Sequence, residues 1–127
     1  MLIPYRDDNP TTSIPIVTVG LIVVNVVIFL FFRVIVAPSD YDKVVYYYGL
    51  IPRELFSAHI FGGTQALPPA LTVFTSMFFH GSFLHLGGNM LYLWIFGNNI
   101  EDYLGHLKFF IFYIVSGLGA MLGHLIV

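Results

Sequence analysis

Long apolar stretches separated by polar segments dominate the chain, and their lengths predict membrane-spanning helices. The first stretch, residues 14–32, contains no charged residue. At a rise of about 1.5 Å per residue it spans roughly 28 Å, close to the ~30 Å hydrocarbon core of a bilayer. Two further helices are predicted at about 83–102 and 107–127. The pattern therefore predicts an all-α membrane protein with about three transmembrane helices.

A long connection, residues 33–70, separates the first two predicted helices. Proline, glycine and charged residues interrupt its aromatic patches, so it does not continue either helix. It is nevertheless too apolar for a free linker, because it contains three consecutive tyrosines at 46–48 and the side chains of Phe56, Ile60 and Phe61. Amphipathic rings settle at membrane interfaces, so we expect a long structured loop that lies partly in the interface.

Composition supports the membrane assignment and narrows the range of partners. The 127 residues are 57% hydrophobic and 9% charged, with a mean hydropathy of +0.85. A water-soluble core of this size could not hide so much apolar surface, because small chains have a high ratio of surface to volume. The net charge is −2 and the basic residues are scattered, so no nucleic-acid partner is expected. The chain has no cysteine, and we predict no cofactor.

One polar cluster, formed by His80, His85 and Asn89, lies within the apolar pattern. Polar residues at membrane depth are costly, so each is a functional candidate. His85 and Asn89 are four residues apart and share one helix face, where both could donate hydrogen bonds to one small volume. Preorganised donors in a water-poor site are what the oxyanion of acyl transfer requires. His80 lies about 140° around such a helix from His85, so we expect it to precede the helix and brace the loop.

Two alternatives to an oxyanion site remain for this cluster. The side chains could be buried polar groups whose hydrogen bonds are satisfied by neighbouring helices. They could also bind zinc, but His-x-x-x-x-His is not the spacing that places two zinc ligands and a base on one helix face. We therefore predict no metal site. His59, His106 and His124 are isolated, and we expect them to be interfacial or packing residues.

Two other polar side chains need an explanation. Asn25 is the one strongly polar residue in the first predicted helix, and we expect it to make an interhelical hydrogen bond that contributes roughly 1 kcal/mol. Glu101 lies roughly 24 Å beyond His85 along a continuous helix, so the two cannot share a site. Glu101 is either a solvated carboxylate beside Asp102 or a brace of the turn between helices two and three, for example through backbone amides at the start of helix three.

These residues resemble those of a known family. The second-helix signature of the rhomboid family is similar to residues 78–106, which read FFHGSFLHLGGNMLYLWIFGNNIEDYLGH. The segments that begin at Pro15 and Asn25 are similar to the family's first helix, residues 48–52 to its first loop, and residues 113–120 to its third helix. The resemblance covers nearly the whole chain.

The resemblance implies an intramembrane serine protease built as a six-helix bundle, with a serine on the fourth helix and a histidine on the sixth. Residues 1–127 would be the N-terminal part of that transmembrane domain. The family pattern assigns oxyanion stabilisation to His85 and Asn89 and a structural role to Glu101, and we keep His80 as structural support. The expected partners are transmembrane protein substrates, the lipid bilayer and the C-terminal helices of the bundle.

The chain also departs from the family. The 127 residues contain no Gly-x-Ser-Gly motif, and Ser116 falls in the third-helix packing motif, so we do not nominate it as nucleophile. Hydrolysis needs an activated hydroxyl within reach of a base, so we predict that the chain alone is inactive. The apolar ending at Val127 has no polar cap, and we expect a truncated form or fragment of an active protease.

Two other functions compete with that hypothesis. A non-catalytic rhomboid-like protein could bind transmembrane helices, or associate with a partner that supplies the remaining helices. A small scaffold or transporter subunit would leave the long match as coincidence. Cleavage of a labelled transmembrane substrate by the 127-residue chain would contradict the predicted inactivity.

We expect an integral multi-pass protein, located in the cell membrane. Three basic residues lie between positions 33 and 53, against one before the first predicted helix, which favours an N-terminus outside under the positive-inside rule. The family resemblance implies the opposite orientation. We adopt the latter, because the counts are small and a structured loop can override them.

Overall fold

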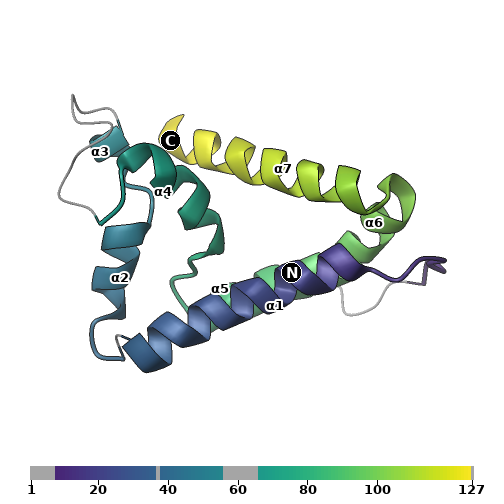
Figure 1. Cartoon of the computed structure of the whole chain (residues 1–127), viewed down its shortest axis with the longest axis horizontal. Helices are drawn as coiled ribbons and strands as arrows, with labels where there is room; N and C mark the ends of the chain where they lie inside the picture. The colour runs from purple at the N-terminus through teal and green to yellow at the C-terminus, as the bar shows by residue number, and fades with distance from the viewer. Residues whose placement is uncertain (1–7, 37, 56–65, 127) are drawn as a thin grey trace.

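The structure, a computed structural model, describes residues 8–36, 38–55 and 66–126 as a series of helices (Figure 1). No residue in these ranges lies in a strand, which confirms the predicted all-α class. In chain order the helices are α1 (Ile16–Leu30), the π-helix η1 (Phe31–Val36), α2 (Tyr41–Tyr48), α3 (Pro52–Leu55), α4 (Pro69–Thr75), the 3₁₀-helix η2 (Ser76–Phe78), α5 (Phe83–Tyr92), the π-helix η3 (Leu93–Gly97), α6 (Asn98–Leu104) and α7 (His106–Ile126).

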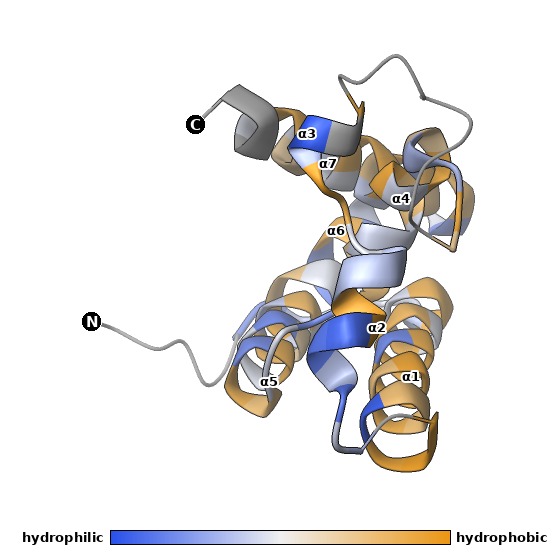
Figure 2. Ribbon diagram, turned by 90° about the vertical axis from the view of Figure 1, so that its left-hand side faces the viewer, coloured by the Kyte–Doolittle hydropathy of each residue, from blue (hydrophilic) through white to orange (hydrophobic). Residues whose placement is uncertain are grey.

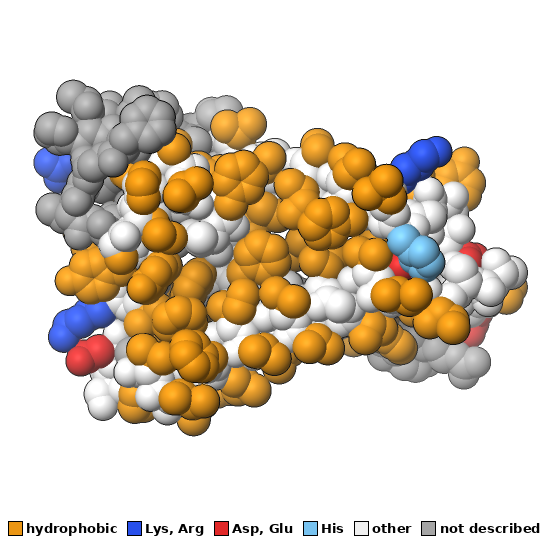
Figure 3. Space-filling view, viewed as in Figure 1, with side chains coloured by type: hydrophobic (Ala, Val, Ile, Leu, Met, Phe, Trp, Pro, Cys, Tyr) orange, Lys and Arg blue, Asp and Glu red, His pale blue; other side chains and the backbone are white. Residues whose placement is uncertain are grey.

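Two of these helices are long and apolar enough to cross a membrane. The first is Ile16–Val36, which joins α1 to η1, and the second is His106–Gly123 in α7. Figure 2 shows α1 as mostly hydrophobic, and Figure 3 shows a face covered by hydrophobic side chains with Lys and Arg near its two ends. The rest of the chain leaves most of both helices uncovered. Apolar surface on this scale is stable in lipid and unstable in water.

The second predicted transmembrane helix is present as a helix but is not one of these two candidate spans. It extends from Phe83 to Leu104 through α5, η3 and α6. The candidates His85 and Asn89, the asparagine pair at 98–99 and the acidic pair at 101–102 lower its hydropathy. The prediction of three transmembrane helices is therefore supported for two of them, and the remaining helix is the one that contains the candidate chemistry.

The connection predicted at 33–70 is shorter in the structure and partly helical. Helix η1 continues to Val36, and α4 begins at Pro69. Proline is favourable at the first position of a helix, where its missing N–H would have had no partner, so the proline pair starts a helix that the sequence did not predict. The described part of the connection contains α2 and α3. Phe56, Ile60 and Phe61 lie outside the described residues.

Helices α1, α2 and α5 meet in a small apolar core. Phe29, Tyr41, Val44 and Leu86 are buried there. The Phe29 ring meets the rings of Tyr41 and Phe83 edge to face, with centroids 5.5 Å and 4.9 Å away. Pairs of this kind add about 0.5–1.5 kcal/mol to the energy of burial. The core fixes the C-terminal half of α1 against the start of α5, where the candidate residues lie.

Helix α7 leaves α6 at Gly105 and runs away from α1 towards α4 (Figure 1). Gly105 has a φ of 79°, a conformation that favours glycine because glycine has no Cβ. Further along α7, a Cβ on Gly117 would lie 2.1 Å from the Cε atom of Met77 in η2. The helix is therefore held at the α6 turn and again at η2.

Candidate functional site

The candidate oxyanion residues lie in the first two turns of α5. Ser82 caps this helix, because its hydroxyl accepts a hydrogen bond from the backbone N–H of His85 at 3.1 Å. His85 and Asn89 share one face of the helix, and both are exposed. A Cβ on Gly88, which lies between them, would meet nothing within 4 Å. This face is open to the approach of another helix.

His80 precedes α5 and is 4% exposed. Its ring contacts the ring of His85, with centroids 5.3 Å apart and planes at 78°. The Tyr41 hydroxyl donates a hydrogen bond to the His80 carbonyl oxygen at 2.8 Å, so α2 holds the turn before α5. Burial, together with the neighbouring His85, lowers the pKa of His80, which keeps this imidazole neutral at pH 7. Its Nδ1 atom has no hydrogen-bond partner in the described part of the chain.

A pocket of about 290 Å³ brings His80 and Asn89 together with Tyr113 of α7. Its remaining lining residues are Met77, Met90, Tyr92 and Leu93. His85 does not line it, so the expectation that both donors face one volume holds for Asn89 alone, and His85 lies beside the pocket against His80. Sequence reasoning missed Tyr113, because it lies far from Asn89 in the chain and its hydroxyl is a weak signal in an apolar helix.

Asn25 connects the first span to the same region. It is fully buried, and its Nδ2 atom donates to the Leu21 carbonyl at 2.7 Å and to the Tyr113 hydroxyl at 3.5 Å. The second contact joins α1 to α7 and is the interhelical hydrogen bond that the sequence predicted, at the long end of the usual range. Helix α7 therefore presents Tyr113 both to Asn25 and to the pocket.

Glu101 is fully buried and accepts hydrogen bonds from the start of α1. The backbone N–H groups of Val17 and Thr18 donate to it at 2.8 Å and 2.7 Å, and the Thr18 hydroxyl donates at 2.7 Å. His106 Nδ1 lies 2.5 Å from the same carboxylate. The sequence suggested backbone amides at the start of helix three as partners of Glu101. In the structure the partners are backbone amides of helix one, because the first turn of α1 lies beside α6. His106, expected to be isolated, is paired.

These contacts explain why the Glu101 side chain is ionised. Burial acts to raise the pKa of this carboxyl, but the hydrogen bonds from Thr18, Val17 and His106 outweigh burial and lower it. Glu101 is therefore ionised at neutral pH. Because a helix N-terminus has unpaired N–H groups and a positive dipole end, a buried carboxylate there replaces the water that these groups would otherwise bind.

Asp102, the next residue, also accepts hydrogen bonds from the chain near the start of α1, and it is less buried than Glu101. Its carboxylate accepts hydrogen bonds from the Ser13 hydroxyl at 2.5 Å, the Ser13 N–H at 2.7 Å and the Thr12 N–H at 3.1 Å. The bonds from Ser13 and Thr12 lower the pKa of Asp102 to about 2. The acidic pair thus ties the segment before α1, and the first turn of α1, to α6.

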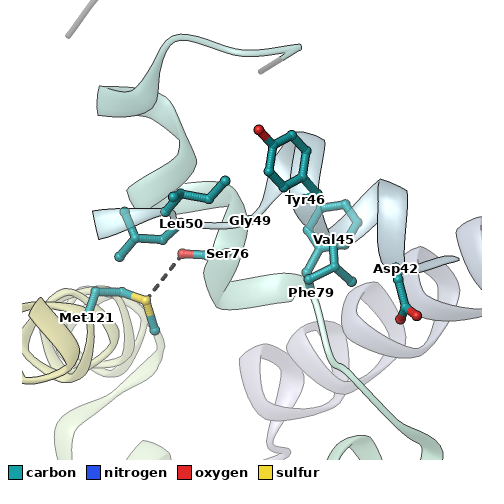
Figure 4. A pocket seen from close by; sticks show the side chains of 9 residues that line it. Asp42, Val45, Tyr46, Gly49, Leu50, Ser76, Phe79 and Met121 are labelled. Atoms are coloured by element: carbon teal, nitrogen blue, oxygen red, sulfur yellow. Dashed lines mark hydrogen bonds between the residues drawn. The ribbon is translucent and has the colours of Figure 1, made fainter. Parts of the chain in front are cut away.

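A larger pocket, of about 430 Å³, lies elsewhere, between α2, η2 and α7 (Figure 4). Its walls are mainly apolar, and the one hydrogen bond drawn there joins the Ser76 hydroxyl to the Met121 sulfur at 3.2 Å. Among the described residues that line it, Asp42 and Tyr46 are the ionisable ones. The candidate site lies instead at α5, where Asn89 lines the smaller pocket and His85 lies beside it against His80. In the described ranges, no group of three His, Cys, Asp or Glu residues could hold a metal ion.

The helical fold and the two uncovered apolar helices indicate a membrane protein of the α-helical class. Residues 69–127 match the family model described as Rhomboid domain. This segment begins at the first residue of α4 and contains His80, His85, Asn89 and Glu101, and its match supports the resemblance to the rhomboid family that the sequence indicated. The comparisons with curated proteins and with solved structures each returned no match.

Proposed function

We propose that this chain supplies the oxyanion-stabilising part of a rhomboid-type intramembrane serine endopeptidase whose substrates are transmembrane proteins. The observation that carries the proposal is the open face of α5, on which His85 and Asn89 lie at i,i+4 spacing beside the buried ring of His80. Attack on a peptide carbonyl places negative charge on its oxygen. Side-chain N–H groups from an imidazole and an amide would stabilise that charge, and the match of residues 69–127 to the Rhomboid domain supports this use.

The nucleophile and the base would come from other helices. The 127 residues contain no Gly-x-Ser-Gly motif, and we do not assign the nucleophile to Ser116, which lies on α7 away from the pocket residues. Small, exposed residues on α7 leave space for a helix beside the site, namely Ser116, Gly119, Ala120 and Gly123. Close helix approach in membranes uses such residues. We therefore propose that the 127 residues alone do not hydrolyse peptide bonds.

Reconstitution tests whether cleavage requires a nucleophile and a base from other helices. The chain would be inserted into liposomes with and without the helices of a rhomboid protease that bear the family's serine and histidine, and cleavage of a fluorescent transmembrane substrate would be measured. We expect cleavage only from the combination. In the combined protein, His85→Ala and Asn89→Ala should each lower the rate about 10²- to 10³-fold, the usual loss for one oxyanion donor.

Asn99→Ala is the matched control, because Asn99 is an asparagine on the same helical run whose Nδ2 bonds the Ile95 carbonyl away from the pocket. It should retain most of the rate. Unchanged cleavage by Asn89→Ala would refute the oxyanion role, and cleavage by the 127-residue chain without additional helices would refute its dependence on them.

Binding of transmembrane helices without cleavage is the alternative function. The exposed small-residue face of α7 favours it, because it would serve a bound substrate helix as well as a helix of the bundle. Photo-crosslinking from Leu122, an exposed residue of α7, to a transmembrane peptide would report such binding. This alternative would be favoured if crosslinking persists in the double variant His85→Ala, Asn89→Ala and if no cleavage occurs with or without the additional helices.

A further inference from the structure

Arg33 occupies an unusual position at the end of the first candidate span, Ile16–Val36. Its Nη1 atom donates to the Pro38 carbonyl at 2.8 Å, and its guanidinium lies 5.5 Å from the centroid of the Tyr41 ring. These two contacts hold the cation beside the turn that follows η1. A guanidinium has five N–H donors, and this hydrogen bond uses one of them. The others are available to a ligand at the membrane surface.

Arg33 lines a small polar pocket of about 150 Å³ that also contains an acid. The other lining residues are Pro38, Ser39, Tyr41, Asp42 and Gly81. Within the described part of the chain, Arg33 forms no ion pair with Asp42, whereas the nearby Asp40 is paired with Lys43 at 3.1 Å. A cation and an anion thus face one pocket without neutralising each other.

This arrangement matches a ligand that carries both charges. We propose that the pocket binds the phosphoethanolamine headgroup of a membrane lipid, with the phosphate at Arg33 and Ser39 and the primary ammonium at Asp42. Arginine binds phosphate oxygens through several N–H groups, and an ammonium donates hydrogen bonds to a carboxylate. A purely anionic headgroup would meet repulsion from Asp42, and a quaternary choline has no N–H to donate.

The size and position of the pocket support a lipid as the source of this group. At about 30 Å³ per water molecule, the pocket holds the equivalent of about five waters, enough for a headgroup but not for acyl chains. Arg33 lies near the end of a 21-residue apolar span, where headgroups are found and where arginine side chains reach polar surroundings. The acyl chains would lie along exposed residues of η1 such as Val34 and Ile35.

Native mass spectrometry of the full chain from nanodiscs tests the proposal. Discs would contain phosphatidylethanolamine, phosphatidylcholine and phosphatidylglycerol in equal amounts, and the lipid retained on the chain would be counted. We expect retention of phosphatidylethanolamine about tenfold over phosphatidylcholine, equivalent to about 1.4 kcal/mol. Equal retention of the two would overturn the proposal.

Two variants separate the charges. Asp42→Asn should abolish the preference for phosphatidylethanolamine over phosphatidylcholine and raise the retention of phosphatidylglycerol, because the repulsive carboxylate is gone. Arg33→Gln should lower retention of all three lipids. Arg53→Gln and Asp8→Asn, which alter exposed charges outside this pocket, are the controls and should retain the wild-type preference.

Two further measurements cover the case in which a variant does not fold and identify the source of the ligand. If Arg33→Gln does not fold, as judged by circular dichroism, Asp42→Asn still tests the pocket, because Asp42 is exposed. A selectivity unchanged in Asp42→Asn would overturn the assignment. Soluble glycerophosphoethanolamine distinguishes the source: failure to displace the lipid supports a bilayer-borne ligand, and displacement at concentrations equal to the lipid would overturn that part of the proposal.

Discussion

The carboxylates of Glu101 and Asp102 are the clearest example of single side chains that position a larger element. Between them they accept hydrogen bonds from the backbone N–H groups of two pairs of residues, at positions 12 and 13 before α1 and at positions 17 and 18 in its first turn. The N-cap residue of α1, Pro15, makes no side-chain capping hydrogen bond. The cap is instead supplied from a distant part of the chain, which makes the two helices depend on each other.

Glu101→Gln should destabilise the fold. Glutamine has one oxygen where the carboxylate has two, so at least one buried N–H of Val17 or Thr18 loses its acceptor. An unsatisfied buried donor costs about 1–3 kcal/mol. The expected result is a lower midpoint of thermal unfolding in detergent. Asp42→Asn removes an exposed acid and should leave that midpoint nearly unchanged; equal midpoints for all three proteins would show that the α1 contact adds no stability.

Acid should weaken the Asp102 contact within a defined pH window. The pKa of Asp102 is about 2 in the folded chain, below its ordinary value of 3.8, so its stabilising effect is complete above about pH 4 and is lost as the pH falls towards 2. Unfolding midpoints of the wild type and Asp102→Asn, measured from pH 6 to pH 2, should converge over this interval. A constant difference between them would contradict the shifted pKa.

At the scale of elements, some helices could be predicted and others could not. The i,i+4 spacing of His85 and Asn89 placed them on one helix face, and the apolar runs located α1 and α7. Helix α4 was missed, because a proline pair reads as a break although proline is favourable at a helix start. The partners of Glu101 and the position of Tyr113 were missed because they depend on contacts between segments more than twenty residues apart, which periodicity does not encode.

Close approach between elements makes two glycines sensitive to substitution. Gly117→Leu should displace the Met77 side chain, whose Cε atom would lie 2.1 Å from a Cβ, and Gly97→Leu should crowd Thr18, whose Oγ1 would lie 3.1 Å from a Cβ. Overpacking of this kind costs about 1–3 kcal/mol. Both variants should unfold at lower temperature in detergent. Gly20→Ala, with nothing within 4 Å of the new Cβ, is the control, and its unfolding temperature should not fall.

At the scale of the whole molecule, the run from α5 to α6 lies antiparallel to α1 over the same height. One end of the pairing is the contact of Phe29 with Phe83, and the other is the contact of Thr18 with Glu101. If α1 and η1 cross a bilayer, the run beside them occupies the same depth. We therefore expect it to cross as well, in spite of its lower hydropathy, with its polar face turned away from lipid.

Single-cysteine labelling tests this topology, since the chain has no cysteine of its own. Thr11→Cys, Ser39→Cys and Tyr103→Cys would be treated in sealed vesicles with a membrane-impermeant maleimide. Three crossings predict that positions 11 and 103 react from the same side and position 39 from the opposite side. Detergent should expose all three, which controls for reactivity, and labelling of positions 39 and 103 from one side would exclude the third crossing.

Because α1 and its cap are far apart in the sequence, α1 is synthesised well before the residues that cap it. Val17 and Glu101 are 84 residues apart, and a ribosome that adds ~5–20 residues per second needs about 4–17 s to cover that distance. During this time the first amides of α1 have no partner from this chain and must remain in contact with water or with the insertion machinery. A newly made α1 would therefore stay near the membrane surface at its N-terminal end until α6 emerges, and slowing elongation between the two should lengthen the period in which it is open to proteolysis.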